Sequence, residues 1–187
     1  MTVSLAGWQR LEGKGQMMNS ELVARARELG QAALRAGVSV STAESCTGGG
    51  IAFYITAISG SSGWFDRGFV TYTAQAKASV LGVPEDTIAQ FGVVSEPVVR
   101  AMACGALERS DAQLSVAVSG IAGPGGAEPG KPVGTVCLGY AWRKAGELFS
   151  QSETRHFPGD RGEVRDRTID TALCELLRLI ESRFLAG

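Results

Sequence analysis

The chain has 187 residues, of which 44% are hydrophobic and 20% are charged, and its formal net charge at pH 7 is -1. This length suits one domain with one core, and the near-neutral charge provides no long-range field for a polyanion, so we expect no nucleic-acid partner. No apolar run approaches the roughly 20 residues that span a bilayer, and the N-terminus lacks the pattern of a secretory signal. We therefore expect a cytoplasmic protein without a membrane partner.

Helical and strand patterns alternate along the first half of the chain. Residues 1–18 have no periodicity and are expected to form a loosely ordered extension, which leaves residues 19–187 for the domain. The patterns that follow predict a helix N-capped by Ser20 and ending near Gly37, a strand Val38–Thr42, a helical run Ile51–Ile58, a buried strand Gly68–Thr73 and a short helix Ala74–Leu81.

The second half adds a hairpin and a long final helix. Its predicted elements are a helix from the N-cap Ser95 to about Arg109, a strand Leu114–Val118, a glycine-rich loop Gly120–Gly134, two paired strands Thr135–Trp142 and Leu148–Phe157, and a helix Gly162–Phe184. Strands that alternate with helices early and pair as a hairpin late predict a three-layer α/β/α sandwich with a mixed, largely parallel sheet.

The densest chemical signal runs from Thr42 to Gly50, where Ser45 lies in a predicted strand-to-helix turn ahead of three glycines. Backbone N–H groups and the helix dipole at such a turn can hold a phosphate or an oxyanion, and a serine beside them is placed to attack a carbonyl. A plain N-cap turn with glycines for tight packing is the alternative. The Gly-x-Ser-x-Gly elbow of other serine hydrolases is absent.

A serine nucleophile needs a base to accept its proton. His156 is the only imidazole, but its place at the end of a predicted strand favours a surface or packing role. Lys77 is the other candidate, because burial can lower the pKa of a lysine until its neutral form accepts a proton. Tyr72, five residues earlier, could converge with it at the edge of the sheet. Spacing alone favours a solvated lysine and a core tyrosine.

Two further features involve phosphate recognition. The segment Gly125–Lys131 matches the opening of a phosphate-binding P-loop, but Pro132 replaces the magnesium-binding hydroxyl and a strand pattern follows instead of a helix. Arg161, ahead of the last helix, could hold a phosphate bidentately or pair with a neighbouring acid, Asp160 or Glu163. Glu44 also has two alternative roles. It could orient Lys77 or the substrate, or it could compensate the charge at the end of a helix.

The cysteines are widely separated and the chain has one histidine, so we expect neither a metal site nor a cofactor.

Several sequence motifs occur in an order typical of one family. They are Glu44-Ser45-Cys46-Thr47-Gly48-Gly49, Gly68-Phe69-Val70-Thr71-Tyr72 with Lys77, Val94-Ser95-Glu96-Pro97-Val98, Ser119-Gly120-Ile121-Ala122-Gly123-Pro124, Pro132-Val133-Gly134-Thr135-Val136 and Gly159-Asp160-Arg161. Through them, roughly residues 20–184 resemble the nicotinamide mononucleotide deamidase family, which is similar to the C-terminal domain of competence/damage-inducible protein A.

The resemblance implies metal-free hydrolysis of the carboxamide of nicotinamide mononucleotide to nicotinate mononucleotide and ammonia. It maps the family's nucleophile to Ser45 and its partners to Tyr72 and Lys77, and it implies a homo-oligomer, a dimer or larger. We expect this pyridine nucleotide to contact the turn and the glycine-rich loop, at Thr47, Gly48, Gly49, Ser119, Gly120, Gly123 and Arg161. Ala74 departs from the asparagine common in the family. The larger relatives carry an N-terminal domain with separate nucleotide chemistry, and we do not expect that second activity here.

Two rival functions remain open. A broader serine amidase is suggested by Gly60-Ser61-Ser62-Gly63, although a lysine upstream of it is missing from a plausible strand. A nucleotide-binding regulatory module that keeps the pocket without turnover is the alternative from a different class. Release of ammonia would separate catalysis from binding.

Overall fold

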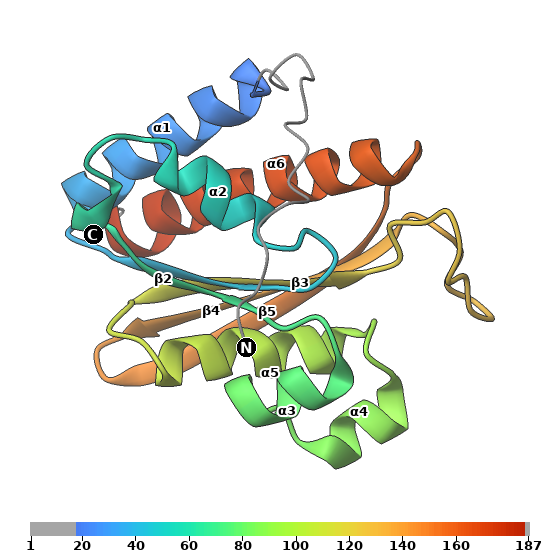
Figure 1. Cartoon of the computed structure of the whole chain (residues 1–187). Coiled ribbons are helices and arrows are strands. Elements are labelled where there is room, and N and C mark those ends of the chain that lie inside the picture. Colours follow the sequence, from blue (N-terminus) through green and yellow to red (C-terminus); the bar gives the residue numbers. More distant parts are fainter. Residues whose placement is uncertain (1–17, 186–187) are drawn as a thin grey trace, which may run out of the picture.

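Helices cover both faces of a five-stranded sheet (Figure 1). The computed structural model describes residues 18–185, so nearly all of the predicted N-terminal extension lies outside the described residues. In the order β2-β1-β3-β4-β5, β1 is parallel to β2 and β3, and β4 is antiparallel to β3 and β5, so four strands share one direction. The predicted mixed-sheet sandwich is therefore confirmed. The strands are β1 (Val40–Glu44), β2 (Phe65–Val70), β3 (Leu114–Gly120), β4 (Thr135–Lys144) and β5 (Glu147–His156).

The two helical layers enclose two separate apolar cores. One face of the sheet carries α1 (Ser20–Ala36), α2 (Gly50–Thr56) and α6 (Arg161–Ile180), and the other carries α3 (Ala74–Leu81), α4 (Glu85–Phe91) and α5 (Glu96–Glu108). Short turns of helix, Ser61–Gly63 before β2 and Glu181–Leu185 after α6, complete the described elements.

Successive side chains of a strand point to opposite faces. In β1, Val40 contributes to the core under α1, α2 and α6, whereas Ala43 contributes to the core beside α5. Continuing this alternation directs Ser45, two residues after Ala43, to the α3 and α5 side.

Local sequence explains how the long helices begin and end. The side chain of Asn19 accepts a hydrogen bond from the N–H of Glu21, so the N-cap of α1 is Asn19 and not Ser20 as predicted. Gly37 ends α1 in the left-handed conformation at φ 62°, as its position predicts. Asp160 and Glu163 form a reciprocal capping box at the start of α6.

In the middle of the chain, one prediction was wrong and one element was missed. The strand expected at Gly68–Thr73 lies three residues earlier, and it is a largely exposed edge strand, because within residues 18–185 it pairs only with β1. The helix α4 was not predicted. It has no buried residue, so it lacks the apolar stripe by which an amphipathic helix is recognised, although Pro84, two acidic residues and Gly92 mark its ends.

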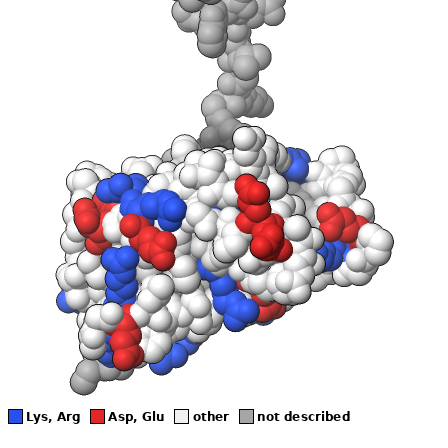
Figure 2. Space-filling view, turned by 90° about the horizontal axis from the view of Figure 1, so that it is seen from below, with Lys and Arg blue, Asp and Glu red and all other residues white. Residues whose placement is uncertain are grey.

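Charge is mixed on the face formed by α3, α4 and α5. Figure 2 shows acidic side chains interspersed with lysine and arginine there, without one continuous basic surface of the kind that follows a nucleic-acid backbone. In the part of the chain that the structure describes, no helix has the length and apolar character needed to cross a membrane.

Candidate active site

Ser45 lies where the carboxyl ends of three parallel strands meet. Its N–H donates to the carbonyl of Val118 at 3.0 Å, while the carbonyl of Glu44 accepts from the N–H of Thr71 at 2.8 Å. These bonds continue the ladders of β3 and β2 past the end of β1. Ligands of open α/β sheets bind beyond the carboxyl ends of the strands. The predicted strand-to-helix turn at Ser45 therefore occupies the edge where a site is expected.

Lys77 meets Ser45 from the second turn of α3. Its Nζ lies 3.0 Å from Ser45 Oγ and donates to the carbonyl of Thr71 at 2.8 Å. The Lys77 side chain is 1% exposed and Ser45 is 8% exposed. The prediction of a solvated lysine, which spacing alone favoured, is therefore wrong. The bond to the Thr71 carbonyl fixes the amine beside the Ser45 hydroxyl.

Burial sets the electrostatics of this pair. It lowers the pKa of Lys77 to about 8, opposed by the neighbouring Cys46. The neutral amine is consequently accessible near physiological pH, as a general base requires. Burial also raises the pKa of the adjacent Cys46 thiol to about 12. Cys46 is thus a protonated thiol, whereas the hydroxyl beside it has a base at hydrogen-bond distance.

Glu44 organises the turn that follows the serine. Its fully buried carboxylate accepts from the hydroxyl of Thr47 at 2.6 Å and from the N–H groups of Ile51 and Ala52 at 3.0 and 2.9 Å. Of the two roles left open for Glu44, the structure shows the helix-end role, and no hydrogen bond in residues 18–185 joins it to Lys77.

Backbone hydrogen bonds within the turn correct the expected oxyanion site at two of its three glycines. We expected N–H groups of Gly48 to Gly50 to be available, but Gly48 donates to the carbonyl of Ser45 and Gly50 donates to the carbonyl of Thr47, at 3.0 and 3.2 Å. Among the described residues, the N–H groups of Cys46, Thr47 and Gly49 donate to no oxygen. The positive φ values of Gly48 and Gly49, 60° and 93°, explain why glycine occupies these two positions.

Tyr72 contacts Arg161 instead of Lys77. Its hydroxyl accepts from Arg161 Nη2 at 3.0 Å, and Arg161 Nη1 donates to the carbonyl of Gly123 at 2.9 Å. Tyr72 is 59% exposed, so the expected burial of its phenol in a strand is wrong. Arg161 forms no ion pair with Asp160 or Glu163 in the described part of the chain. The exposed residues Tyr72 and Arg161 are therefore joined to the backbone of the buried Gly123, and the three come from distant segments of the chain.

Thr47, Ser119 and Gly120 are the remaining residues that we expected to contact the substrate. The side chains of Thr47 and Ser119 are buried, and the Ser119 hydroxyl donates to the carbonyl of Val93 at 2.7 Å. A Cβ on Gly120 would lie 2.7 Å from Val136 Cγ2, so close packing against β4 accounts for this glycine. At these three positions, only backbone atoms are free to contact a substrate.

The competing chemical assignments are not supported by contacts. His156 is exposed at the end of β5, and no hydrogen bond among the described residues joins it to Ser45. In the P-loop-like segment, Glu128 and Lys131 pair in a β-bridge, and β4 follows where a P-loop needs a helix. Ser61–Gly63 forms a short turn of helix before β2, with Gly60 as its N-cap, and no lysine bonds to its serines in residues 18–185.

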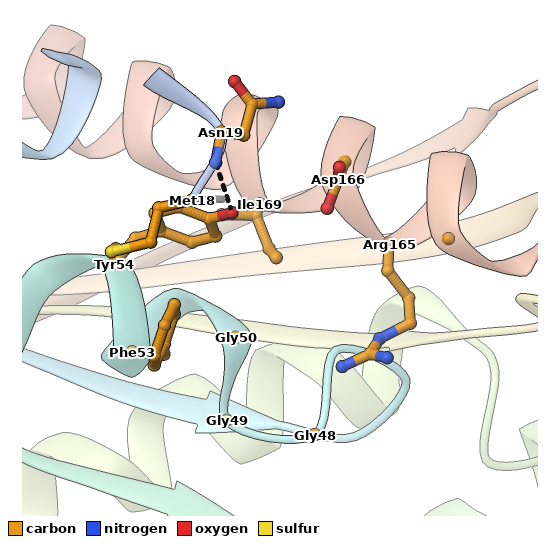
Figure 3. A pocket seen from close by; sticks show the side chains of 11 residues that line it. Met18, Asn19, Gly48, Gly49, Gly50, Phe53, Tyr54, Arg165, Asp166 and Ile169 are labelled. Atoms are coloured by element: carbon orange, nitrogen blue, oxygen red, sulfur yellow. Dashed lines mark hydrogen bonds between the residues drawn. The ribbon is translucent and has the colours of Figure 1, made fainter. Parts of the chain in front are cut away.

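A cavity of about 580 Å³ lies on the other side of the turn, between α2 and α6 (Figure 3). Neither Ser45 nor Lys77 lines it, which agrees with the alternation of β1. Arg165 extends from α6 to its wall, where Nη2 donates to the carbonyl of Thr47 at 2.7 Å. The residues around the cavity are Met18, Asn19, Gly48, Gly49, Gly50, Phe53, Tyr54, Gly162, Arg165, Asp166 and Ile169.

Sequence reasoning missed two residues that hold the site together. The carbonyl of Thr71 anchors Lys77, and Arg165 contacts the turn from 118 positions away in the chain. A backbone carbonyl leaves no signal in a sequence, and Arg165 resembles any solvated helical arginine. Within residues 18–185, no three His, Cys, Asp or Glu side chains gather as a metal site would require.

Comparison with known proteins gives consistent results. Residues 23–180 match the family model described as the CinA C-terminal domain. The chain is 51% identical over 157 residues to "Nicotinamide-nucleotide amidohydrolase PncC" of Escherichia coli K12, covering 84% of this chain and 93% of the relative. It is 52% identical over 154 residues to the protein of the same name from Pseudomonas putida, covering 82% and 94%. The crystal structure of competence/damage inducible protein CihA from Agrobacterium tumefaciens superposes with a TM-score of 0.79 at 46% identity, covering 85% of this chain and 95% of that one.

Proposed function

The chain belongs to the CinA C-terminal domain family, and on this premise we propose that it hydrolyses the carboxamide of nicotinamide mononucleotide to nicotinate mononucleotide and ammonia. Relatives about half identical over most of the chain are named nicotinamide-nucleotide amidohydrolase. The observation that carries the proposal is the 3.0 Å contact between Lys77 Nζ and Ser45 Oγ in a buried setting. A hydroxyl and an amine at this distance are what nucleophilic attack on an amide carbon needs.

In the proposed reaction, Ser45 Oγ attacks the carboxamide carbon while neutral Lys77 accepts its proton. The C–O bond that forms generates a tetrahedral oxyanion, for which the N–H groups of Cys46 and Thr47 are the nearest donors in sequence. The Lys77 ammonium returns its proton to the leaving nitrogen, and ammonia departs as the C–N bond breaks. Water then attacks the acyl-enzyme, Lys77 accepts a proton from it, and nicotinate mononucleotide leaves as Ser45 recovers its proton.

Tyr72 has a different role in this proposal from that of a second base. Because its hydroxyl bonds to Arg161, we assign both to the nucleotide's phosphate or ribose, beside Gly123. A guanidinium binds phosphate well, and the exposed position of this group leaves room for a ligand. Binding energy from the phosphate would then position the reacting carboxamide at Ser45.

The direct test is release of ammonia and nicotinate mononucleotide from nicotinamide mononucleotide, with and without EDTA. We expect turnover in both conditions, much weaker turnover of free nicotinamide, and none for Ser45→Ala. Binding of the mononucleotide without release of ammonia would instead identify a regulatory module. Equal turnover of free nicotinamide would remove Arg161 and Tyr72 from the proposed binding site.

A further inference from the structure

The turn after Ser45 is held from two sides at a single residue, Thr47. From the strand side, the buried carboxylate of Glu44 accepts from the Thr47 hydroxyl at 2.6 Å. From the α6 side, Arg165 Nη2 donates to the Thr47 carbonyl at 2.7 Å. The hydroxyl and the carbonyl of one residue are thus fixed by opposite charges that come from β1 and α6.

Glu44 does more than bond to Thr47. One carboxylate oxygen accepts from both the Thr47 hydroxyl and the N–H of Ile51, and the other accepts from the N–H of Ala52. The positive end of α2 is therefore neutralised by a residue of the chain itself. An incoming anion would have to compete with a buried carboxylate for these N–H groups, which makes the start of α2 a poor site for a substrate phosphate.

We propose that Glu44 and Arg165 act as positioning residues, which clamp Thr47 so that the backbone N–H groups following Ser45 are fixed around the developing oxyanion. This inference rests on the proposed function, because it assigns a role to those N–H groups in acyl transfer. Donors held in place before reaction need no reorganisation as charge develops, whereas a displacement of about 1 Å can cost about 100-fold in rate. The clamp touches neither the amine of Lys77 nor the Tyr72–Arg161 group.

Glu44→Gln and Arg165→Met test the two arms of the clamp. In Glu44→Gln, the amide must direct its NH₂ at a backbone N–H group or at the Thr47 hydroxyl, so one side of the turn loses its acceptor. Thr42→Val is the matched control for Glu44, because the Thr42 hydroxyl bonds to the same carboxylate at the longer distance of 3.4 Å and not to the oxygen that holds Thr47. Arg167→Met is the control for Arg165, because Arg167 is exposed on the same helix.

We expect each clamp variant to lower kcat about 10- to 100-fold with KM changed less than about threefold. The rate at which a fluorophosphonate labels Ser45 should fall in parallel, since that reaction also places negative charge on an oxygen beside the serine. The pH midpoint of kcat should stay near that of the wild type. Arg161→Met should behave oppositely, with KM as its main change.

Other outcomes would overturn the clamp. A raised KM with normal kcat in Arg165→Met would make Arg165 a substrate ligand in the α2–α6 cavity. Unchanged kcat and labelling in Arg165→Met would show that the contact between Arg165 and Thr47 does not contribute to the reaction. Because Arg165 is partly exposed, its variant serves as the test if Glu44→Gln does not fold. If the wild type releases no ammonia yet Ser45 is labelled, the proposed function fails while labelling still tests the clamp. No labelling of the wild type would overturn both.

Discussion

At the scale of single residues, Lys77 makes the rate depend on pH in a defined direction. The neutral amine is the form that accepts the serine proton, and burial lowers its pKa to about 8. We therefore expect kcat to rise as pH increases through about 8 and then to level off. Steady-state kinetics in overlapping buffers would measure this profile, with circular dichroism as the control for folding. A rate that falls between pH 7 and 9 would contradict the assignment of Lys77 as the base.

The same residue distinguishes a base from a fixed charge. Lys77→Met should reduce kcat by about 100- to 10,000-fold, the usual cost of losing a general base. Lys77→Arg should not restore it, because a guanidinium remains protonated at working pH. Tyr72→Phe should affect KM more than kcat, since the phenol bonds to Arg161. Near-normal turnover of Lys77→Arg would instead make Lys77 a fixed cation.

The neighbouring hydroxyl and thiol provide a second comparison. Ser45→Ala should abolish turnover, whereas Cys46→Ser should keep most of it, because burial raises the pKa of the Cys46 thiol to about 12 and holds it protonated. Ammonia release from folded variants would measure both. A folded but inactive Cys46→Ser would transfer the nucleophile assignment to the thiol.

At the scale of elements, local pattern predicted some features and three-dimensional contacts determined others. The apolar stripe of α1 and the proline and N-cap of α5 predicted those helices, and the glycines after Ser45 predicted its turn. The bounds of β2 were predicted incorrectly, because the β-forming run Phe69–Thr73 extends past Val70, where pairing with β1 ends. The sequence made Lys77 a candidate base. Its contact with Ser45 depends on how α3 packs against the sheet, which the sequence pattern does not show.

The position of α3 depends on close approach to α5 at Gly105. A Cβ at this position would collide with the backbone carbonyl of Leu81, the last residue of α3. Gly105→Ala should therefore lower stability by about 1–3 kcal/mol, despite the better helix propensity of alanine. Because α3 carries Lys77, kcat should fall as well.

Thermal unfolding and kinetics of Gly105→Ala test this connection between two helices. Gly125→Ala is the matched control for stability, because a Cβ on Gly125 has no atom within 4 Å. If Gly105→Ala unfolds at a lower temperature but keeps its kcat, the placement of α3 does not limit the reaction.

At the scale of the whole molecule, burial of the Lys77 amine makes its neutral form more available as a base but lowers the stability of the folded protein. Its pKa is about 8 in the folded protein against an ordinary 10.5, so between these values the unfolded chain binds more protons than the folded one. Wild-type stability should consequently gain a contribution as pH rises from 8 to 10.5, and the full cost of burying the amine applies below about pH 8. Lys77→Met removes that cost, so its stability relative to the wild type should be greatest below pH 8 and should decrease toward pH 10.5. Denaturant unfolding of both proteins at matched pH values measures this difference, in which other titrating groups cancel, and a difference that is independent of pH would show that burial does not lower the Lys77 pKa.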